Sequence, residues 1–393
     1  MSDPTNSSTS PQVSPLLEQL DVVDHNADES QLPKRKNVYG LDEKGLTEEL
    51  IAMGQAKFRA KQIADWIYKK GVTNFSEMTN LSSKLREELS QKYCFGHLEI
   101  AISQISKDGT EKRLYRLPDG QMIESVLMPY QDGRRTACIS SQAGCAMGCS
   151  FCATGQMGFA RHLTAEEIFE QVQAFSTELQ QKGERLSNLV FMGMGEPFHN
   201  YNELIKAIHM VKDRLGIGAR KITVSTVGLV PKIKQFAKEG LQVKLAISLH
   251  ATSDEERSLI MPINRKYSIA ELIEACHEFV NATRRRITFE WALIQGENDS
   301  EDIARKLAQL LKGLLCHVNV IPLNPTKGYD GAPSDPERVN RFVATLEAQG
   351  VPATIRVRRG IDIDAGCGQL KSEVERKKRQ QTEQGKALVQ IEG

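Results

Sequence analysis

Three cysteines in one short stretch are the residues of this chain best suited to hold a metal centre. They lie in Cys145-Ala-Met-Gly-Cys149-Ser-Phe-Cys152. Iron–sulfur clusters are held by cysteine thiolates, normally four, so three thiols leave one iron open to a ligand from outside the protein. Zinc would need a fourth ligand, for which His162 is the nearest candidate. Three unrelated core cysteines are the remaining alternative, and the spacing favours the cluster.

Polar side chains follow several apolar segments that have the pattern of strands. Glycines surround a glutamate in Gly193-Met-Gly195-Glu196-Pro197, where they allow the backbone to approach a ligand and the carboxylate can accept from an ammonium group. Further polar residues end later strands, namely Ser225, Ser248, His250 and Asn324. Each one alone is also explained as an ordinary strand terminus. Together, on one rim, they predict a binding site.

Two cysteines outside the motif are candidates for a different chemistry. Cys138 lies on a predicted strand, and Cys367 lies between glycines in Asp364-Ala-Gly366-Cys367-Gly368. A thiol in a flexible, accessible loop is poorly placed to fill a core and well placed to react. Packing is the alternative for both thiols, and it is the prediction for the other free cysteines, Cys94, Cys276 and Cys316.

Strand and helix patterns alternate from about residue 136 and predict an α/β fold with a parallel sheet. A capping box of Thr164 and Glu167 begins one helix. No GxGxxG fingerprint follows a strand, so a partial (β/α)6 barrel is favoured over a Rossmann-like sheet. Chemistry in such barrels lies at the C-terminal ends of strands. The predicted strands are Thr136–Ser140, Asn188–Met192, Lys221–Ser225, Val243–Leu249, Arg286–Leu293, Val318–Pro322 and Thr354–Val357.

The chain divides by composition and periodicity into five predicted segments. The polar composition of residues 1–37 indicates a disordered tail. Helical periodicity predicts a small accessory domain whose interspersed basic residues suit RNA contact, and an ordinary amphipathic helical module is the alternative. The remaining segments are an antiparallel lead-in, a core barrel and a basic, polar C-terminal tail. The last four segments span residues 38–96, 97–131, 132–372 and 373–393.

The overall composition is that of a globular protein with no strong global charge. The chain has 393 residues, of which 40% are hydrophobic and 26% are charged, and its formal net charge is +1. Any RNA-binding surface is therefore a local patch. Eight cysteines without a signal peptide predict a cytoplasmic protein with free thiols. No apolar run reaches the length of a membrane span, so no membrane association is expected.

The Cx3CxxC spacing with Phe151 before the last cysteine resembles the radical S-adenosylmethionine (AdoMet) superfamily. The stretch from Cys145 to Asn324 is similar to the RlmN/Cfr branch of RNA methyltransferases, and the resemblance covers roughly residues 40 to 375. It implies a partial barrel that holds a 4Fe-4S cluster on Cys145, Cys149 and Cys152. It also implies that AdoMet is contacted by Gly195, Glu196, Ser225, Ser248, Leu249, His250 and Asn324.

The same resemblance implies a role for each of the two outer thiols. Cys367 would carry a methyl group taken from one AdoMet, Cys138 would resolve the covalent product as a disulfide, and Glu124 would be the general base. A second thiol is chemically useful because an electron-poor adenine carbon does not attack a methyl sulfonium, so the methyl carbon must be held on the protein while a radical forms on it. An exposed strand glutamate is the alternative for Glu124.

The expected reaction is methylation of C2 of an adenosine in 23S ribosomal RNA and also of one in transfer RNA. The implied electron donor is of the flavodoxin type, and the protein is expected to be a monomer. Arg356, Arg358 and Arg359, and the run Arg284-Arg285-Arg286, are candidates for phosphate contacts. The alternatives are a Cfr-type enzyme that methylates C8, another radical-AdoMet enzyme such as a glycyl-radical activase, and a zinc-stabilised RNA-binding module.

Overall fold

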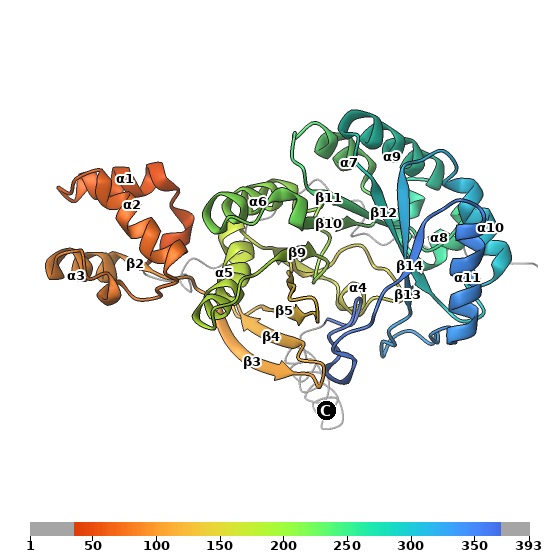
Figure 1. Cartoon of the computed structure of the whole chain (residues 1–393), viewed down its shortest axis with the longest axis horizontal. Coiled ribbons are helices and arrows are strands. Elements are labelled where there is room, and N and C mark those ends of the chain that lie inside the picture. The colour runs from red at the N-terminus through yellow and green to blue at the C-terminus, as the bar shows by residue number, and fades with distance from the viewer. Residues whose placement is uncertain (1–34, 371–393) are drawn as a thin grey trace, which may run out of the picture.

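A single curved sheet of ten strands organises the protein, whose computed structural model describes residues 35–370 (Figure 1). The strand order is β14-β13-β12-β11-β10-β9-β6-β5-β4-β3. Neighbours from β6 to β14 are parallel, and β3, β4, β5 and β6 pair antiparallel. β14 and β3 are the outer strands of this order and do not pair with each other, so the barrel is partial. The fold class expected from the sequence is confirmed.

All seven parallel strands expected from the sequence are present, with limits that agree to within two residues. The alternation of strand and helix was sufficient to find them because each strand is a short segment rich in apolar and β-branched residues. Their bounds are β6 Arg135–Cys138, β9 Asn188–Phe191, β10 Ile222–Thr226, β11 Lys244–Ser248, β12 Ile287–Leu293, β13 Cys316–Pro322 and β14 Ala353–Ile355. The antiparallel strands are β3 Glu99–Ile105, β4 Glu111–Arg116 and β5 Met122–Pro129.

The helices of the barrel lie around the outside of the curved sheet (Figure 1). Each buries an apolar stripe against it, and on α9 this stripe includes Leu272, Cys276 and Phe279, so Cys276 is a packing residue. The expected capping box at Thr164 is present at the start of α5. The helices are α5 Ala165–Gln181, α6 Tyr201–Leu215, α7 Val230–Ala237, α8 Asp254–Ile260, α9 Ile269–Thr283, α10 Glu301–Leu310 and α11 Pro336–Ala348.

A small antiparallel pair, β7 (Gln142–Gly144) and β8 (Phe159–His162), is absent from the sequence-based prediction. The three-cysteine loop therefore follows β7 and not β6 directly. Gly144 has φ +76°, and a Cβ there would lie 2.1 Å from the carbonyl oxygen of Gly158. Only glycine permits this close crossing. The short helix α4 (Ala153–Met157) completes the loop between the two strands.

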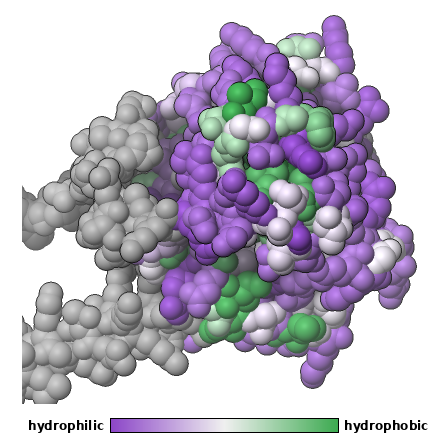
Figure 2. Space-filling model, turned by 90° about the vertical axis from the view of Figure 1, so that its left-hand side faces the viewer, coloured by the Kyte–Doolittle hydropathy of each residue, from purple (hydrophilic) through white to green (hydrophobic). Residues whose placement is uncertain are grey.

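Three helices form a separate lobe at the left of Figure 1, namely α1 Glu43–Ala52, α2 Phe58–Ala64 and α3 Ser83–Lys92. The two-residue strands β1 (Lys36–Asn37) and β2 (Tyr93–Cys94) pair in parallel and bring the ends of this lobe together. Figure 2 shows this end of the molecule as largely hydrophilic. No helix in residues 35–370 is long and apolar enough to span a membrane. The predictions for residues 1–34 and 373–393 lie outside the described residues.

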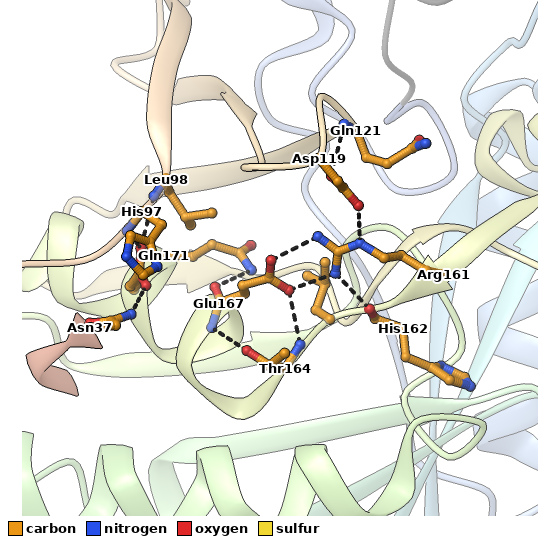
Figure 3. A network of polar contacts seen from close by, with 12 residues as sticks. Asn37, His97, Leu98, Asp119, Gln121, Arg161, His162, Thr164, Glu167 and Gln171 are labelled. Atoms are coloured by element: carbon orange, nitrogen blue, oxygen red, sulfur yellow. Dashed lines mark hydrogen bonds and ion pairs between the residues drawn. The ribbon is translucent and has the colours of Figure 1, made fainter. Parts of the chain in front are cut away.

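Two glutamates of α5 connect the barrel to the segments that precede it (Figure 3). Glu167 pairs with Arg161 at 2.8 Å, and Arg161 also pairs with Asp119 in the turn before β5. Glu170 accepts hydrogen bonds from the backbone N–H groups of His97 and Leu98, at 2.7 and 2.9 Å, and from the Asn37 side chain. The buried carboxyl of Glu170 therefore holds the helical lobe against the barrel.

The stability of the protein is expected to fall as the pH rises from about 4.5 to about 7, in part through Glu170. Burial raises the pKa of the Glu170 carboxyl to about 7. The folded state thus binds its proton more tightly than the unfolded state, and this contribution is complete below the unfolded pKa and lost as the pH passes 7. The loss is at most about 3 kcal/mol. Urea unfolding across this range should show a shallower fall for Glu170→Gln than for the wild type.

The matched control is Glu48→Gln, because Glu48 is an exposed helical glutamate whose side chain is 66% accessible. It should follow the wild-type curve. If the free energy of unfolding depends on pH in Glu170→Gln as it does in the wild type, the Glu170 carboxyl does not contribute to that dependence.

Candidate active site

The three-cysteine loop is held in the middle of the barrel by main-chain hydrogen bonds to distant segments. Cys145 N donates to the Gly158 carbonyl at 2.8 Å, and Ser150 N donates to that of Ile260 at 3.0 Å. Ala153 N, next to the third cysteine, donates to the Gly368 carbonyl at 2.7 Å. The loop is thus fixed from three sides. Its last contact brings the segment that carries Cys367 beside it.

The surroundings of the three thiols suit an iron–sulfur cluster. Burial raises the pKa of Cys145, Cys149 and Cys152, and neighbouring thiols raise it further. Three thiolates without a metal would be energetically unfavourable in this buried site, whereas coordination to a cationic cluster deprotonates thiols outright. Each thiolate of such a cluster binds its own iron. The three sulfurs therefore need not converge on a single ion, and within residues 35–370 no His, Cys, Asp and Glu group is arranged to hold one.

The zinc alternative required His162 as a fourth ligand, and the structure gives this side chain other neighbours. Its Nδ1 lies 3.0 Å from Nε2 of Gln142, and its ring packs edge-on against His199 with centroids 4.7 Å apart. Phe151, in contrast, lies with its ring edge-on to His250 at 5.0 Å. This aromatic contact packs the three-cysteine loop against the residues at the C-terminal end of β11.

The glycine segment after β9 packs against the start of the cluster loop. A Cβ on Gly193 would lie 2.7 Å from the backbone of Ile139, and one on Gly195 would lie 2.5 Å from Cβ of Gln142. These glycines thus allow two parts of the chain to approach, which is a different use from the ligand approach expected from the sequence. Glu196 is 2% exposed, and burial raises its pKa to about 7. Its carboxylate accepts from Val227 N at 2.9 Å and Phe198 N at 3.0 Å.

The C-terminal ends of β10 and β11 lie side by side, as expected for neighbouring parallel strands, and bring together four of the predicted residues: Ser225, Ser248, Leu249 and His250. His250 has φ +63° and a ring that is almost fully buried. Its Nδ1 accepts from Ala292 N at 2.9 Å. Burial, aided by the nearby Arg257 charge, lowers the pKa of His250 to about 3, so the ring is neutral and its proton is on Nε2. His250 is therefore a neutral hydrogen-bond donor.

Asn324, after β13, joins this rim to the Cys367 segment. Its Nδ2 donates to the Cys367 carbonyl at 3.0 Å. Its Oδ1 is buried and has no hydrogen-bond partner within the described residues. An unpaired buried acceptor is costly unless a ligand completes it. Together with the donor on His250, this oxygen fits the polar groups of a bound AdoMet.

Arg257, on α8, is a buried residue of the site that sequence reasoning missed. Its guanidinium is 0% exposed and donates to the carbonyls of Val227, Ser248 and Leu249 and to Oδ1 of Asn264, at 2.6 to 3.1 Å. These carbonyls belong to the rim strands and the loops that follow them. The charge also interacts with Cys149. Arg257 therefore fixes the ends of β10 and β11 beside the three-cysteine loop, and no local sequence motif indicates this role.

Arg257→Met is expected to destabilise the protein by about 3–5 kcal/mol, because it removes the shared donor from four buried acceptors. Anaerobic urea unfolding measures this change. The control Arg265→Met alters an exposed arginine a few residues further on and should change stability by less than about 0.5 kcal/mol. A loss below about 1 kcal/mol for Arg257→Met would contradict this role.

A pocket at the same end of the barrel is lined by both outer thiols. Cys138 comes from β6 and Cys367 from the segment after β14, and they share this pocket with Met192, Asn324 and Arg356. Cys138 is buried, and burial raises the pKa of its thiol to about 12, with a further contribution from Cys367. The structure thus brings together two cysteines that are far apart in the sequence.

Arg356 is a cation placed between these thiols and a buried carboxylate. Its Nη1 lies 3.7 Å from Oε2 of Glu290 and 3.4 Å from Sδ of Met192. The charges of Cys367 and then of Glu290 raise the pKa of Arg356. The charge of Arg356 also acts to lower the pKa of the Cys138 thiol, against the larger effect of burial. The sequence suggested a phosphate contact for this residue, and the structure places it inside the thiol pocket.

Glu124 lies on β5 as a buried residue, with an exposed fraction of 3%, which differs from the exposed strand glutamate that was the alternative. Its Oε1 lies 3.5 Å from Nζ of Lys112 on the neighbouring strand. A carboxylate is almost never fully buried unless it is paired, and Lys112 is the partner here. This environment is compatible with the role of a base.

Comparison with known proteins agrees with the site. A model of the radical SAM superfamily matches residues 139–307, and a model of the ribosomal RNA large subunit methyltransferase N-terminal domain matches residues 36–95. The dual-specificity RNA methyltransferase RlmN 1 of Myxococcus xanthus is 48% identical over 87% of this chain and 96% of its own length. A probable RlmN of Clostridium perfringens is 48% identical over 86% of this chain and 96% of its own length.

Among solved structures, a radical SAM methyltransferase from Sphaerobacter thermophilus superposes with a TM-score of 0.83 at 48% identity. The match covers 86% of this chain and all of that chain. The two family models thus cover the helical lobe and residues 139–307 of the barrel. The enzymes of this superfamily use a 4Fe-4S cluster and AdoMet, and the chain belongs to the RlmN family of radical-AdoMet RNA methyltransferases.

Proposed function

We propose that this enzyme methylates C2 of one adenosine in 23S ribosomal RNA and of an adenosine in transfer RNA. The names of its relatives, dual-specificity RNA methyltransferases, support two RNA substrates. The observation that carries the reaction type is the shared pocket of Cys138 and Cys367 beside the cluster loop. A methyl carrier and a resolving thiol need to be within reach of each other.

The chain's own residues have distinct parts in this scheme. When bound, the cluster and AdoMet supply the methyl group and the means to abstract a hydrogen atom from it. Cys367, as a thiolate, takes the methyl group by displacement and holds it in the pocket. Once that carbon is joined to the adenine, one electron must leave the adduct, for which the cluster would be the acceptor, and Glu124 removes the ring proton. Cys138 then attacks the Cys367 sulfur, which forms a disulfide and releases the methylated base.

The proposed ligand set follows the geometry of the rim. Cys145, Cys149 and Cys152 would hold the cluster. Asn324 and His250 would supply an acceptor and a donor to AdoMet, and the remaining contacts would come from Gly195, Glu196, Ser225, Ser248 and Leu249. A flavodoxin-type protein as electron donor, a monomeric enzyme and a cytoplasmic location complete the proposal.

The test uses the full chain, purified without oxygen and loaded with cluster, together with AdoMet that carries a deuterated methyl group. A 23S rRNA fragment and a transfer RNA are incubated separately, digested and analysed by mass spectrometry against 2-methyl- and 8-methyladenosine standards. Labelled 2-methyladenosine from both RNAs is expected. Labelled 8-methyladenosine would replace the proposal with the Cfr-type reaction, and product from one RNA alone would exclude dual specificity.

A further inference from the structure

Lys112 is a buried lysine that links the proposed base to the segment carrying the proposed methyl carrier. In the pairing of β4 with β5, Lys112 is opposite Val126 and Leu114 is opposite Glu124. Lys112 and Glu124 are therefore diagonal neighbours on the same face of the sheet. Nζ of Lys112 lies 3.5 Å from Oε1 of Glu124 and 3.4 Å from the carbonyl oxygen of Asp364. The two side chains are 10% and 4% exposed.

Stability alone gives a weak reason for this arrangement. Taking two charges out of water costs about as much as their attraction returns, and an apolar pair of the same size is often equally stable. The second contact of Lys112 is informative, because Asp364 lies three residues before Cys367 in the same segment. Asp364 has φ +52°, a conformation that a non-glycine residue keeps only when its surroundings hold it.

The turn between β3 and β4 also contacts the segment that leads to Cys367. Ser106 donates to Asp362 at 2.5 Å, and Gly360 N donates to the Asp108 carboxylate at 3.2 Å. The β3–β4 hairpin thus contacts residues 360–364 at several points, and one of these contacts, Lys112, also reaches Glu124. A shift of the Cys367 segment would be transmitted to the base through this ammonium group.

We propose that Lys112 is a positioning residue that holds the carboxylate of Glu124 at a fixed place relative to Cys367. The inference rests on the proposed function, in which the radical adduct at C2 first gives up one electron, for which the iron–sulfur cluster would be the acceptor. The C2–H bond then breaks, its proton passes to an oxygen of Glu124 and its electron pair stays in the ring. Attack by the Cys138 thiolate then forms the S–S bond as the bond between the Cys367 sulfur and carbon breaks, and the carbon takes up a proton. Lys112 itself transfers no proton.

The experiment separates the step that Lys112 serves from the steps before it. Lys112→Met and Lys112→Arg are compared with the wild type and with Lys107→Met, which changes an exposed lysine of the same hairpin. Three quantities are measured: the S-methyl group on Cys367, the RNA covalently bound to protein in a single turnover, and the methylated RNA released. Cluster absorption and thermal unfolding verify that each variant is folded.

Lys112→Met is expected to methylate Cys367 within about twofold of the wild type, to accumulate bound RNA, and to release product on the order of 10²-fold more slowly, the scale of a general-base contribution. Lys112→Arg should recover at least part of this loss, and Lys107→Met should match the wild type. A structural role would lower Cys367 methylation and product release together and would overturn the inference, as would wild-type release by Lys112→Met.

If Lys112→Met loses its cluster absorption, the same three measurements are made on Lys112→Gln instead. Glutamine keeps a hydrogen-bond donor for the Asp364 carbonyl and removes the positive charge. Wild-type release by that variant would equally overturn the inference. A failure of the proposed function is distinguishable, since the wild type would then carry no S-methyl group on Cys367 and no variant would bind RNA covalently.

Discussion

Cys138→Ala is expected to leave the enzyme covalently joined to its RNA and unable to complete a second turnover. The pocket places this thiol beside Cys367, where it is the second of the two cysteines available to release the product. Without it, methyl transfer to Cys367 and bond formation to the adenine proceed, and the bond between the two molecules remains. Product release should fall on the order of 10⁴-fold or more, as for other residues that act as part of a covalent mechanism.

Denaturing gel electrophoresis with labelled RNA measures this adduct directly. Cys367→Ala is the matched comparison, since it removes the carrier and should give neither an adduct nor a methylated cysteine. Cys316→Ala is the control, because this thiol is buried at the opposite end of β13. Free release of methylated RNA by Cys138→Ala would exclude the resolving role.

Cys149→Ala is expected to reduce the iron content from about four atoms per chain to nearly none, since a cluster held by three thiolates does not survive the loss of one. All methylation should cease with it, including that of Cys367, because the proposed methyl donor is AdoMet bound at this site. The cluster content is measured by iron analysis and by the visible absorption band of the reconstituted protein.

The control for this second prediction is Cys276→Ala, because it removes a thiol that is equally buried but lies on the packed face of α9. This variant should keep its iron, and any effect should be limited to a modest loss of stability. Full iron and colour in Cys149→Ala, or zinc in place of iron in the wild type, would contradict the assignment of the cluster.

The order of strands and helices was accessible from the sequence for a local reason. Every parallel strand is a short segment rich in apolar and β-branched residues, and the capping box at Thr164 and the stripe on α9 are patterns within one helix. The same holds for the cysteine motif, whose spacing within one loop indicates its chemistry. The β7–β8 pair was missed because its strands are short and depend on a glycine crossing at Gly144 that leaves no periodic signal.

The contacts that complete the site were decided by the tertiary structure alone. Arg257 and Lys112 have their partners on other elements, so no pattern in their own helix or strand distinguishes them from an exposed cation. Likewise, the sequence marked Cys138 and Cys367 as separate thiols, and only closure of the barrel brings them to one pocket. Local periodicity reports how a segment is buried, whereas the choice of partner depends on which segments the whole fold brings together.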